Sequence, residues 1–464
     1  MDDLPQEIVD HIANHVVFDE SLDPGPYTRL SPLATLSRAW QDAIESITFQ
    51  KLEIKSDELY TFQQLMTGRR RHYLADLEFE VVLPTYTSTQ AEMLETPIDR
   101  QANNACFTRA VRELFITLKD WENEEIQRPM RLGFGKVFSA VDTRKGIPLS
   151  GNSRHREVSY ISLIAPDSLP TLSRVRELDF YHPYMFPETT MVSPQEAPLL
   201  LKLLPNINKT FWHFNDLDDE SEKIAYAEAI KATKLQLRSE LIMEFCTTCI
   251  DGHVLVDPIL LPYGLLSAAI RTVSQNLTVM TLEFNFDATL FWPSTSESSG
   301  TPYWPHLKEL RIESKLFKLF ANPDFYRMEY EDSNEDDYND NEIIRVTEHP
   351  MAPILAAFAK AVQNMPSLEY FYFLGGSEEL LGGTPIPLPG LGTFVIVYHC
   401  PGPWRDRDRM AETKEEKTFR RIYYACENGN IWRPEDEVVV ALRNAGEEKF
   451  GGKLIEGSRM ISMM

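Results

Sequence analysis

Five segments of this chain share one pattern, in which a proline or asparagine precedes a leucine or isoleucine and then two apolar residues that flank a single residue. The segments are LPTLSRVRELDF (169–180), LPNINKTFWHF (204–214), QNLTVMTLEF (275–284), WPHLKELRI (304–312) and MPSLEYFYF (365–373). Each ends on an apolar pair with period two, which is typical of a strand that buries one face. The pattern therefore predicts several short, half-buried strands.

Weaker strand signals and helical segments alternate with these five segments. Three further apolar pairs predict strands, and they are Leu77 with Phe79, Leu114 with Ile116, and Val395 with Val397. Residues 193–204 begin with Ser193 and carry Glu196 three places later, which is the arrangement of a capping box at the start of a helix. Residues 351–363 place apolar side chains on one helical face.

Strands and helices that alternate around a shared core are the organisation of a leucine-rich-repeat solenoid, in which each unit covers the apolar face of its neighbour. The spacing is irregular here, with 24 residues between Phe371 and Val395 and 34 between Leu178 and Trp212. Regular repeats have periods of about 20 to 29 residues. The sequence thus predicts an irregular solenoid, and the alternative is an unrelated α/β domain with several similar strands.

The first sixty residues predict short amphipathic helices. Pro5 suits the first helical position, because the N–H that proline lacks has no partner there, and Ile8, Ile12 and Val16 then recur every four residues, with Val9 beside them. A second helical stretch, broken at most once, is indicated by apolar residues at steps of three and four: Leu33, Leu36, Trp40, Ile44 and Ile47. Two such helices bury too little apolar surface to be stable alone, so we expect them to pack against a partner or a docked domain.

The segments LPQEIVDHI, LATLSRAWQDAI and ITFQKLEI resemble the F-box, as found in the large F-box families of filamentous fungi. The Leu-Pro opening, the acidic residue and isoleucine after it, and the Ser-Arg-x-Trp motif carry the resemblance. It implies a three-helix unit whose apolar seam docks on the Skp-type adaptor of a cullin-RING ubiquitin ligase. The adaptor-binding residues that it implies are Leu4, Pro5, Ile8, Ile12, Leu33, Leu36 and Trp40.

Two features of the N-terminal segment depart from the F-box pattern. Residues 18–29 are longer and richer in proline and glycine than the usual link between the first two helices. Ser37 stands where many members of the family carry cysteine.

The resemblance extends to the body of the chain, which is similar to the degenerate leucine-rich repeats of F-box proteins. The expected fold is α/β: a three-helix F-box (1–55), an irregular leucine-rich-repeat-like strand–helix solenoid (56–400) and a helical C-terminal cap (401–464). We expect an unfolded surface loop at 329–342, because this segment has eight acidic residues and no basic one.

Two helices are expected in the C-terminal cap. Residues 411–428 are charged and have a helical pattern, and residues 433–446 place Pro434 at the start of a second helix. A polar terminal cap is what a solenoid needs to end its apolar core.

Charge and cysteine content limit the expected partners. There are 46 Lys and Arg against 70 Asp and Glu, a formal charge of −24, which disfavours nucleic acid and anionic membranes. The acidic start MDDLPQEIVD is unlike a secretory signal, and no charge-free apolar run reaches about 18 residues. The five scattered cysteines do not suggest a disulfide framework. We expect a cytoplasmic or nuclear protein without a membrane partner.

The sequence offers few candidates for catalysis. LGFGKVFSAV (132–141) is similar to the opening of a kinase glycine-rich loop, but Phe138 replaces the third glycine and the other kinase motifs are missing. Cys246 and Cys249 with His253 could bind zinc or exchange thiols, yet a structural zinc site needs four ligands and no second pair follows. We therefore expect no catalytic residue, no metal and no cofactor.

The resemblance implies a non-catalytic substrate-recognition subunit of a Skp–cullin–F-box ubiquitin ligase. The F-box would bind the adaptor and, through it, the cullin, while the repeats would present an unidentified target protein. The alternative is a repeat-type interaction scaffold without a ubiquitin role, whose N-terminal helices cap the solenoid. The exposure of Leu4, Ile8, Ile12 and Trp40 distinguishes the ligase subunit from the scaffold. A solvent-exposed apolar patch indicates docking, and burial against the repeats indicates a cap.

Overall fold

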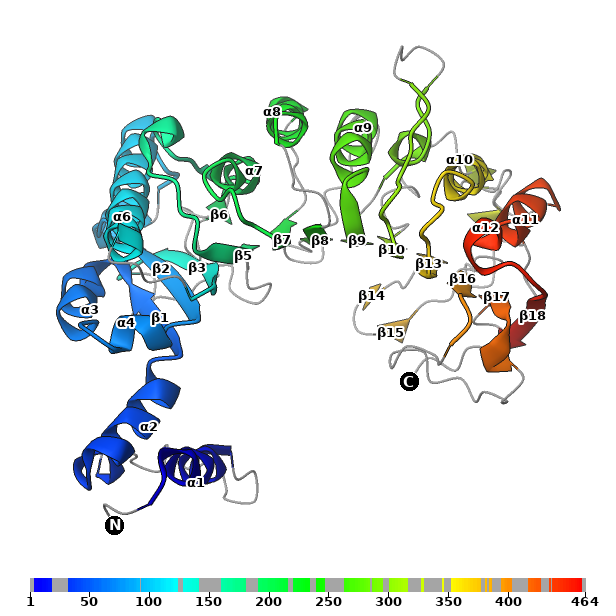
Figure 1. Cartoon of the computed structure of the whole chain (residues 1–464). Coiled ribbons are helices and arrows are strands. Elements are labelled where there is room, and N and C mark those ends of the chain that lie inside the picture. The colour runs from blue at the N-terminus through cyan, green and yellow to red at the C-terminus, as the bar shows by residue number, and fades with distance from the viewer. Residues whose placement is uncertain are drawn as a thin grey trace, which may run out of the picture. The chain divides into compact units, whose positions relative to one another are not determined.

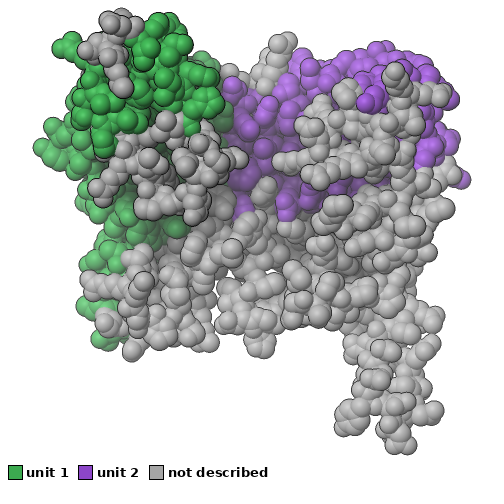
Figure 2. All heavy atoms as spheres, turned by 90° about the horizontal axis from the view of Figure 1, so that it is seen from below, with its two compact units in different colours: residues 1–207 green, residues 208–464 purple. Residues whose placement is uncertain are grey.

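The computed structural model describes most of the chain, in two compact units, Met1–Ile207 and Asn208–Met464 (Figure 2). The described residues are 4–18, 32–91, 93–123, 128–141, 160–180, 191–215, 220–233, 239–246, 263–283, 286–294, 300–315, 327–328, 344–345, 352–376, 380–381, 384–385, 394–402, 416–426, 434 and 436–460. The chain is a mixed α/β protein, and most of its paired strands are parallel. No helix of the described part combines the length and apolar content needed to cross a membrane.

Unit 1 begins with helices and continues as alternating strands and helices (Figure 1). Its helices are α1 (Gln6–Phe18), α2 (Arg38–Thr48), α3 (Leu59–Leu65), α4 (Arg70–Tyr73), α5 (Ser88–Ala91), α6 (Pro97–Asn123) and α7 (Glu196–Leu201), with 3₁₀ turns η1 (Leu33–Thr35), η2 (Ser56–Glu58) and η5 (Pro166–Ser168). Its strands are β1 (Lys51–Lys55), β2 (Asp76–Leu83), β3 (Met130–Ser139), β4 (Tyr160–Ile161), β5 (Val175–Phe180) and β6 (Met191–Val192).

The main strands of unit 1 lie side by side in the order β1, β2, β3, β5, and every pair is parallel. Two rows of buried side chains cross β2, β3 and β5 in register, one made of Leu77, Leu132 and Leu178 and the other of Phe79, Phe134 and Phe180. The rings of Phe134 and Phe180 stack at 4.9 Å. The alternating apolar pairs of the sequence therefore form the core of this unit.

Unit 2 continues the alternation of strands and helices. Its helices are α8 (Glu220–Lys231), α9 (Tyr263–Ser274), α10 (Ala352–Val362), α11 (Asp436–Arg443) and α12 (Glu447–Phe450), with 3₁₀ turns η6 (Ala288–Leu290) and η8 (Glu416–Thr418). Its strands are β7 (Lys209–Asn215), β8 (Ser239–Cys246), β9 (Leu277–Glu283), β10 (Glu309–Lys315), β11 (Arg327–Met328), β12 (Ile344–Arg345), β13 (Tyr370–Gly376), β14 (Leu380–Leu381), β15 (Thr384–Pro385), β16 (Phe394–His399), β17 (Arg420–Cys426) and β18 (Leu454–Met460).

Unit 2 contains a large, mostly parallel sheet in the order β7, β8, β9, β10, β13, β16, β17, β18. Only β16 runs antiparallel to its neighbours in this sheet. One row of buried side chains follows the register from β7 to β17 and consists of Trp212, Met243, Leu282, Ile312, Phe373, Ile396 and Tyr424. Helices α8, α9 and α10 lie on one side of the strands of this unit (Figure 1).

Most of the predicted strands are confirmed. Each of the five segments with the shared pattern contains a strand, namely β5, β7, β9, β10 and β13. The weaker pairs at Leu77 and at Val395 lie in β2 and β16. The helix predicted at 351–363 is α10, whose apolar face is buried.

The strand predicted at Leu114 and Ile116 is wrong, because both residues lie in α6. This helix has a capping box, in which Asp99 N donates to Thr96 Oγ1 at 3.2 Å and Thr96 N donates to Asp99 Oδ2 at 3.1 Å. The buried side chains of α6 recur with helical spacing, and they include Phe107, Val111, Leu114, Phe115, Leu118 and Trp121. The helical period of these buried residues, which extends over about four turns from Phe107 to Trp121, outweighs one alternating pair.

The capping box predicted at Ser193 is also wrong. Helix α7 begins at Glu196 and has no side-chain cap, and Glu196 N donates to the backbone carbonyl of Ser193. The Glu196 side chain is buried and accepts hydrogen bonds from the Leu163 backbone and the Ser162 side chain instead. The Glu196 carboxylate thus binds residues distant in the chain and not the start of its own helix.

The C-terminal region is not the purely helical cap that we expected. The segment 411–428 contains strand β17, which pairs with β16 and β18, and the segment 433–446 contains α11 as predicted. Ile422 and Tyr424 of β17 are both buried and have the period of two that is typical of a strand. The end of this segment is therefore a strand, although its charged residues suggested a helix. The acidic segment at 329–342 lies outside the described residues.

Candidate protein-docking site

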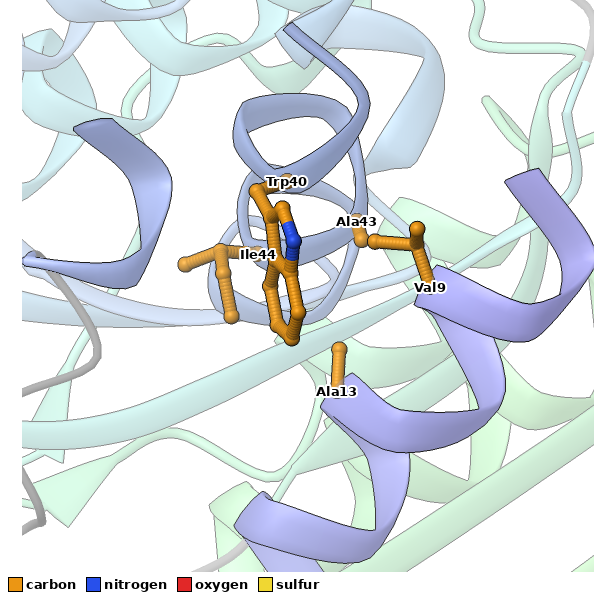
Figure 3. Close-up of a cluster of buried hydrophobic side chains, with 5 residues drawn as sticks. All are labelled: Val9, Ala13, Trp40, Ala43 and Ile44. Atoms are coloured by element: carbon orange, nitrogen blue, oxygen red, sulfur yellow. The ribbon is translucent and has the colours of Figure 1, made fainter. Parts of the chain in front are cut away.

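Helices α1 and α2 form a small apolar core of their own. Val9 and Ala13 of α1 face Trp40, Ala43 and Ile44 of α2, and each of the five keeps at most 6 % of its surface exposed (Figure 3). The two alanines have short side chains, which let the helices approach closely. We call these five residues the α1–α2 core.

Local hydrogen bonds determine where the two helices begin. The Pro5 carbonyl accepts from the N–H groups of Ile8 and Val9, so Pro5 immediately precedes the first helical residue. Ser37 has an extended backbone and its Oγ accepts from Trp40 N at 3.3 Å, which is a side-chain N-cap for α2. Gln6 Nε2 donates to the Ala39 carbonyl at 3.1 Å and ties the two helix starts together.

Leu4, Pro5, Ile8 and Ile12 form an exposed band along α1, which we call the N-terminal apolar stripe. Leu4 is 42 % exposed, Ile8 47 % and Ile12 38 %. The spacing of four residues places them on one side of the helix, next to the buried side that carries Val9 and Ala13. Helix α1 thus presents apolar side chains both to α2 and to solvent.

The remaining predicted docking residues divide between surface and core. Leu36, the residue that ends η1, is 50 % exposed. Leu33 is half-buried and packs against the α1–α2 core, and Trp40 belongs to that core. The structure therefore leaves five of the seven residues at the surface and uses two for internal packing.

Sequence reasoning missed Ala13 and Ala43 as core residues. A signal was present, because Ala13 lies four residues after Val9 and therefore on the same helical face. Residues 19–31, which hold most of the long predicted link, lie outside the described residues. We call the unit made of α1, η1 and α2 the N-terminal module.

A charged cluster lies on the strands of unit 1, centred on Arg131 of β3. Its guanidinium is 2.6 Å from Asp76 Oδ1, 2.5 Å from Asp179 Oδ2 and 3.4 Å from Glu78 Oε2. The four side chains are 17 to 26 % exposed. Burial raises the pKa of Glu78 to about 7, opposed by Arg131 and reinforced by the two aspartates.

Gly133 lies beside this cluster, and a Cβ there would displace the Glu78 carboxylate from its present position. The glycine-rich segment 132–141, which is similar to a kinase loop in sequence, is mainly strand β3 between β2 and β5. Its glycines therefore make room for a neighbouring side chain in a sheet.

The predicted metal or thiol candidates are only partly described. Cys246 is the last residue of β8, and Cys249 and His253 lie outside the described residues. Among the residues that the structure describes, no group of three or more His, Cys, Asp and Glu side chains is arranged to hold a metal ion.

Comparison with known proteins adds no family assignment: no protein-family model matches the sequence, and no curated protein matches it.

Proposed function

We propose that this chain is a substrate-recognition subunit of a Skp–cullin–F-box ubiquitin ligase, which docks on the Skp-type adaptor through the N-terminal module. The observation that supports the proposal most is the exposure of Leu4, Ile8 and Ile12 beside a buried core. A helix that only capped the strands would turn these side chains inward. Within the described residues they stay exposed while Val9 and Ala13 are buried.

In the N-terminal module, the residues that hold the helices together differ from those that would bind a partner. Its internal contacts come from the α1–α2 core, which keeps the helices together without using the N-terminal apolar stripe. Fully burying a leucine or isoleucine side chain is worth about 1.5 to 3 kcal/mol, so covering the half-exposed side chains of the stripe with a partner would contribute a part of that to docking.

The role of the chain in ubiquitin transfer would be proximity. A target held on the strand–helix body of the chain would be kept close to a ubiquitin-charged enzyme on the same scaffold, which raises the effective concentration of its lysines. No residue of this chain needs to enter the chemistry. The strand–helix body, which resembles degenerate leucine-rich repeats, is the proposed target-binding region.

The test is co-purification of the full chain with a Skp-type adaptor. We expect the native chain to bind and the double variant Ile8→Ala and Ile12→Ala to lose most of the binding, as should Leu4→Ala with Pro5→Ala. Ile98→Ala is the matched control, since Ile98 is an exposed isoleucine (79 %) on α6, outside the N-terminal module. Unchanged adaptor binding by the stripe variants would contradict the proposal and favour the scaffold alternative.

A further inference from the structure

The connection between the N-terminal module and the first strand is very short. Only Phe49 and Gln50 separate α2 from β1. The Gln50 carbonyl accepts hydrogen bonds from the N–H groups of Ala75 and Asp76, each at 2.9 Å. The helical module is therefore joined to β1 and β2 by a two-residue turn that is itself hydrogen-bonded to the sheet.

The basic segment GRRRHY (68–73) contacts α2 next to this turn, and the proposed function does not use it. Arg70 of α4 places Nη2 2.7 Å from Glu45 Oε1 of α2. The preceding residue, Arg69, places Nη1 2.5 Å from Asp42 Oδ2, one helical turn away. Two successive arginines thus face two carboxylates on the same helix.

Arg70 also contacts the turn and α3. Its guanidinium lies over the Phe49 ring, 4.8 Å from the centroid, and Nη1 donates to the Leu65 carbonyl at 3.1 Å. The hydrogen bond from Arg70 lowers the pKa of Glu45 against the opposing effect of burial. One side chain therefore joins α2, the connecting turn and the end of α3.

The two ion pairs are not equally protected from water. The Arg70 and Glu45 side chains are 30 % and 17 % exposed, whereas those of Arg69 and Asp42 are 74 % and 35 % exposed. Exposed ion pairs contribute little, because solvent screens them and their side chains lose freedom. The pair between Arg70 and Glu45 is the stronger link.

We propose that Arg70 is a positioning residue that locks the N-terminal module to the first strand–helix segment of unit 1, with Glu45 as its partner. A protein bound to the N-terminal apolar stripe is then held in one orientation relative to β1 and β2. The consequence for a ligase rests on the proposed function, because transfer to a tethered lysine depends on a fixed geometry. The lock itself does not depend on that function.

The lock is tested on the full chain by pulsed electron spin resonance between two labels introduced as non-natural amino acids. The labels replace Asn14 of α1 and Glu113 of α6, which are both exposed. We expect one narrow distance peak in the native chain and loss of that peak in Arg70→Ala. Arg100→Ala is the matched control, because Arg100 also pairs with a carboxylate, at 3.6 Å from Glu95, but away from α2.

A charge exchange supplies the rescue. Glu45→Arg alone should lose the narrow peak, and Glu45→Arg combined with Arg70→Glu should restore it. Hydrogen exchange of β2 and β3 verifies folding, and the isosteric Glu45→Gln replaces Arg70→Ala if that variant does not fold. A broad distribution in the native chain, or a narrow peak that survives both Arg70→Ala and Glu45→Gln, would overturn the lock.

Adaptor binding separates this inference from the proposed function. Arg70→Ala should bind the Skp-type adaptor as tightly as the native chain, because the N-terminal apolar stripe is untouched. A loss of affinity in this variant would place Arg70 in docking and overturn its positioning role. A native chain that does not bind the adaptor refutes the proposed function alone, since the distance measurement contains no adaptor.

Discussion

Ile8 and Val9 are neighbours in the chain, yet 47 % of Ile8 is exposed while Val9 is 1 % exposed. Val9 faces Trp40 in the α1–α2 core, and Ile8 belongs to the N-terminal apolar stripe. Val9 thus contributes to the internal packing of the N-terminal module, whereas Ile8 is left at its surface for the proposed partner. Substitutions at the two positions should therefore have different effects.

Trp40→Ala should destabilise the N-terminal module by about 3 kcal/mol, because it removes the largest side chain of the α1–α2 core. Ile8→Ala should change its stability little, since the side chain is half exposed already. Hydrogen exchange of the α1 and α2 amides measures this locally, without a two-state assumption for a chain with two units. Equal protection in both variants would contradict the assignment of core and stripe.

Arg131→Ala should lower the free energy of unfolding of unit 1 by about 2 kcal/mol at pH 8, because three carboxylates lose the cation between them. The loss should shrink toward pH 5, because Glu78, whose pKa is raised to about 7, takes up a proton and no longer needs the cation. Hydrogen exchange of the β2 and β3 amides, measured at pH 5 and pH 8, reports the local free energy of unfolding. Lys51→Ala is the control, since Lys51 pairs with Asp76 at 3.6 Å but is 76 % exposed.

Glu196 should make unit 1 less stable as pH rises. Burial raises the pKa of Glu196 to about 8 in the folded chain, whereas an unfolded glutamate titrates near 4.3. The folded state therefore holds the proton more tightly, and stability falls by about 1.4 kcal/mol per pH unit between these values and levels off above about pH 8.

Glu196→Gln should remove this slope, because the amide has no proton to lose. Its melting temperature relative to the native chain should rise from pH 5 to pH 8, measured in matched buffers. The control Glu113→Gln changes an exposed glutamate of α6 and should keep the native pH dependence. A parallel pH profile for Glu196→Gln and the native chain would contradict the assignment.

Arg420→Ala should lower the local free energy of unfolding of β18 by about 3 kcal/mol. The buried Arg420 side chain donates to the carbonyls of Arg443 and Ala445, at and after the end of α11, and of Gly451 and Gly452, which follow α12. Arg420→Lys should not rescue, because an ammonium group cannot reach acceptors on several sides as the planar guanidinium does. Hydrogen exchange of β18 measures the loss.

The matched control for Arg420 is Arg443→Ala. The Arg443 side chain is 45 % exposed and pairs with Glu456 at 2.7 Å, so its removal should change β18 protection little. Similar losses in the two variants would show that the buried carbonyl contacts are not what holds β18.

Local periodicity is enough to predict most of the strands and the alignment of the stripe residues on one helical face. Leu310 with Ile312 and Phe371 with Phe373 have period two and lie in β10 and β13. The spacing of four residues between Ile8 and Ile12 places them on one helical face. These relationships depend only on backbone geometry, which is the same in any fold.

Long-range packing selects the surface that each apolar residue faces, and the period that prevails where a helical and a strand pattern overlap. Leu114 with Ile116 has the local alternation of a strand, but the buried residues of α6 recur with the helical period and the segment is helical. Trp40 could have faced a partner, but Ala13 and Ala43 leave room for it between the helices. Such outcomes depend on contacts between residues far apart in the chain, where burial free energy exceeds local preference.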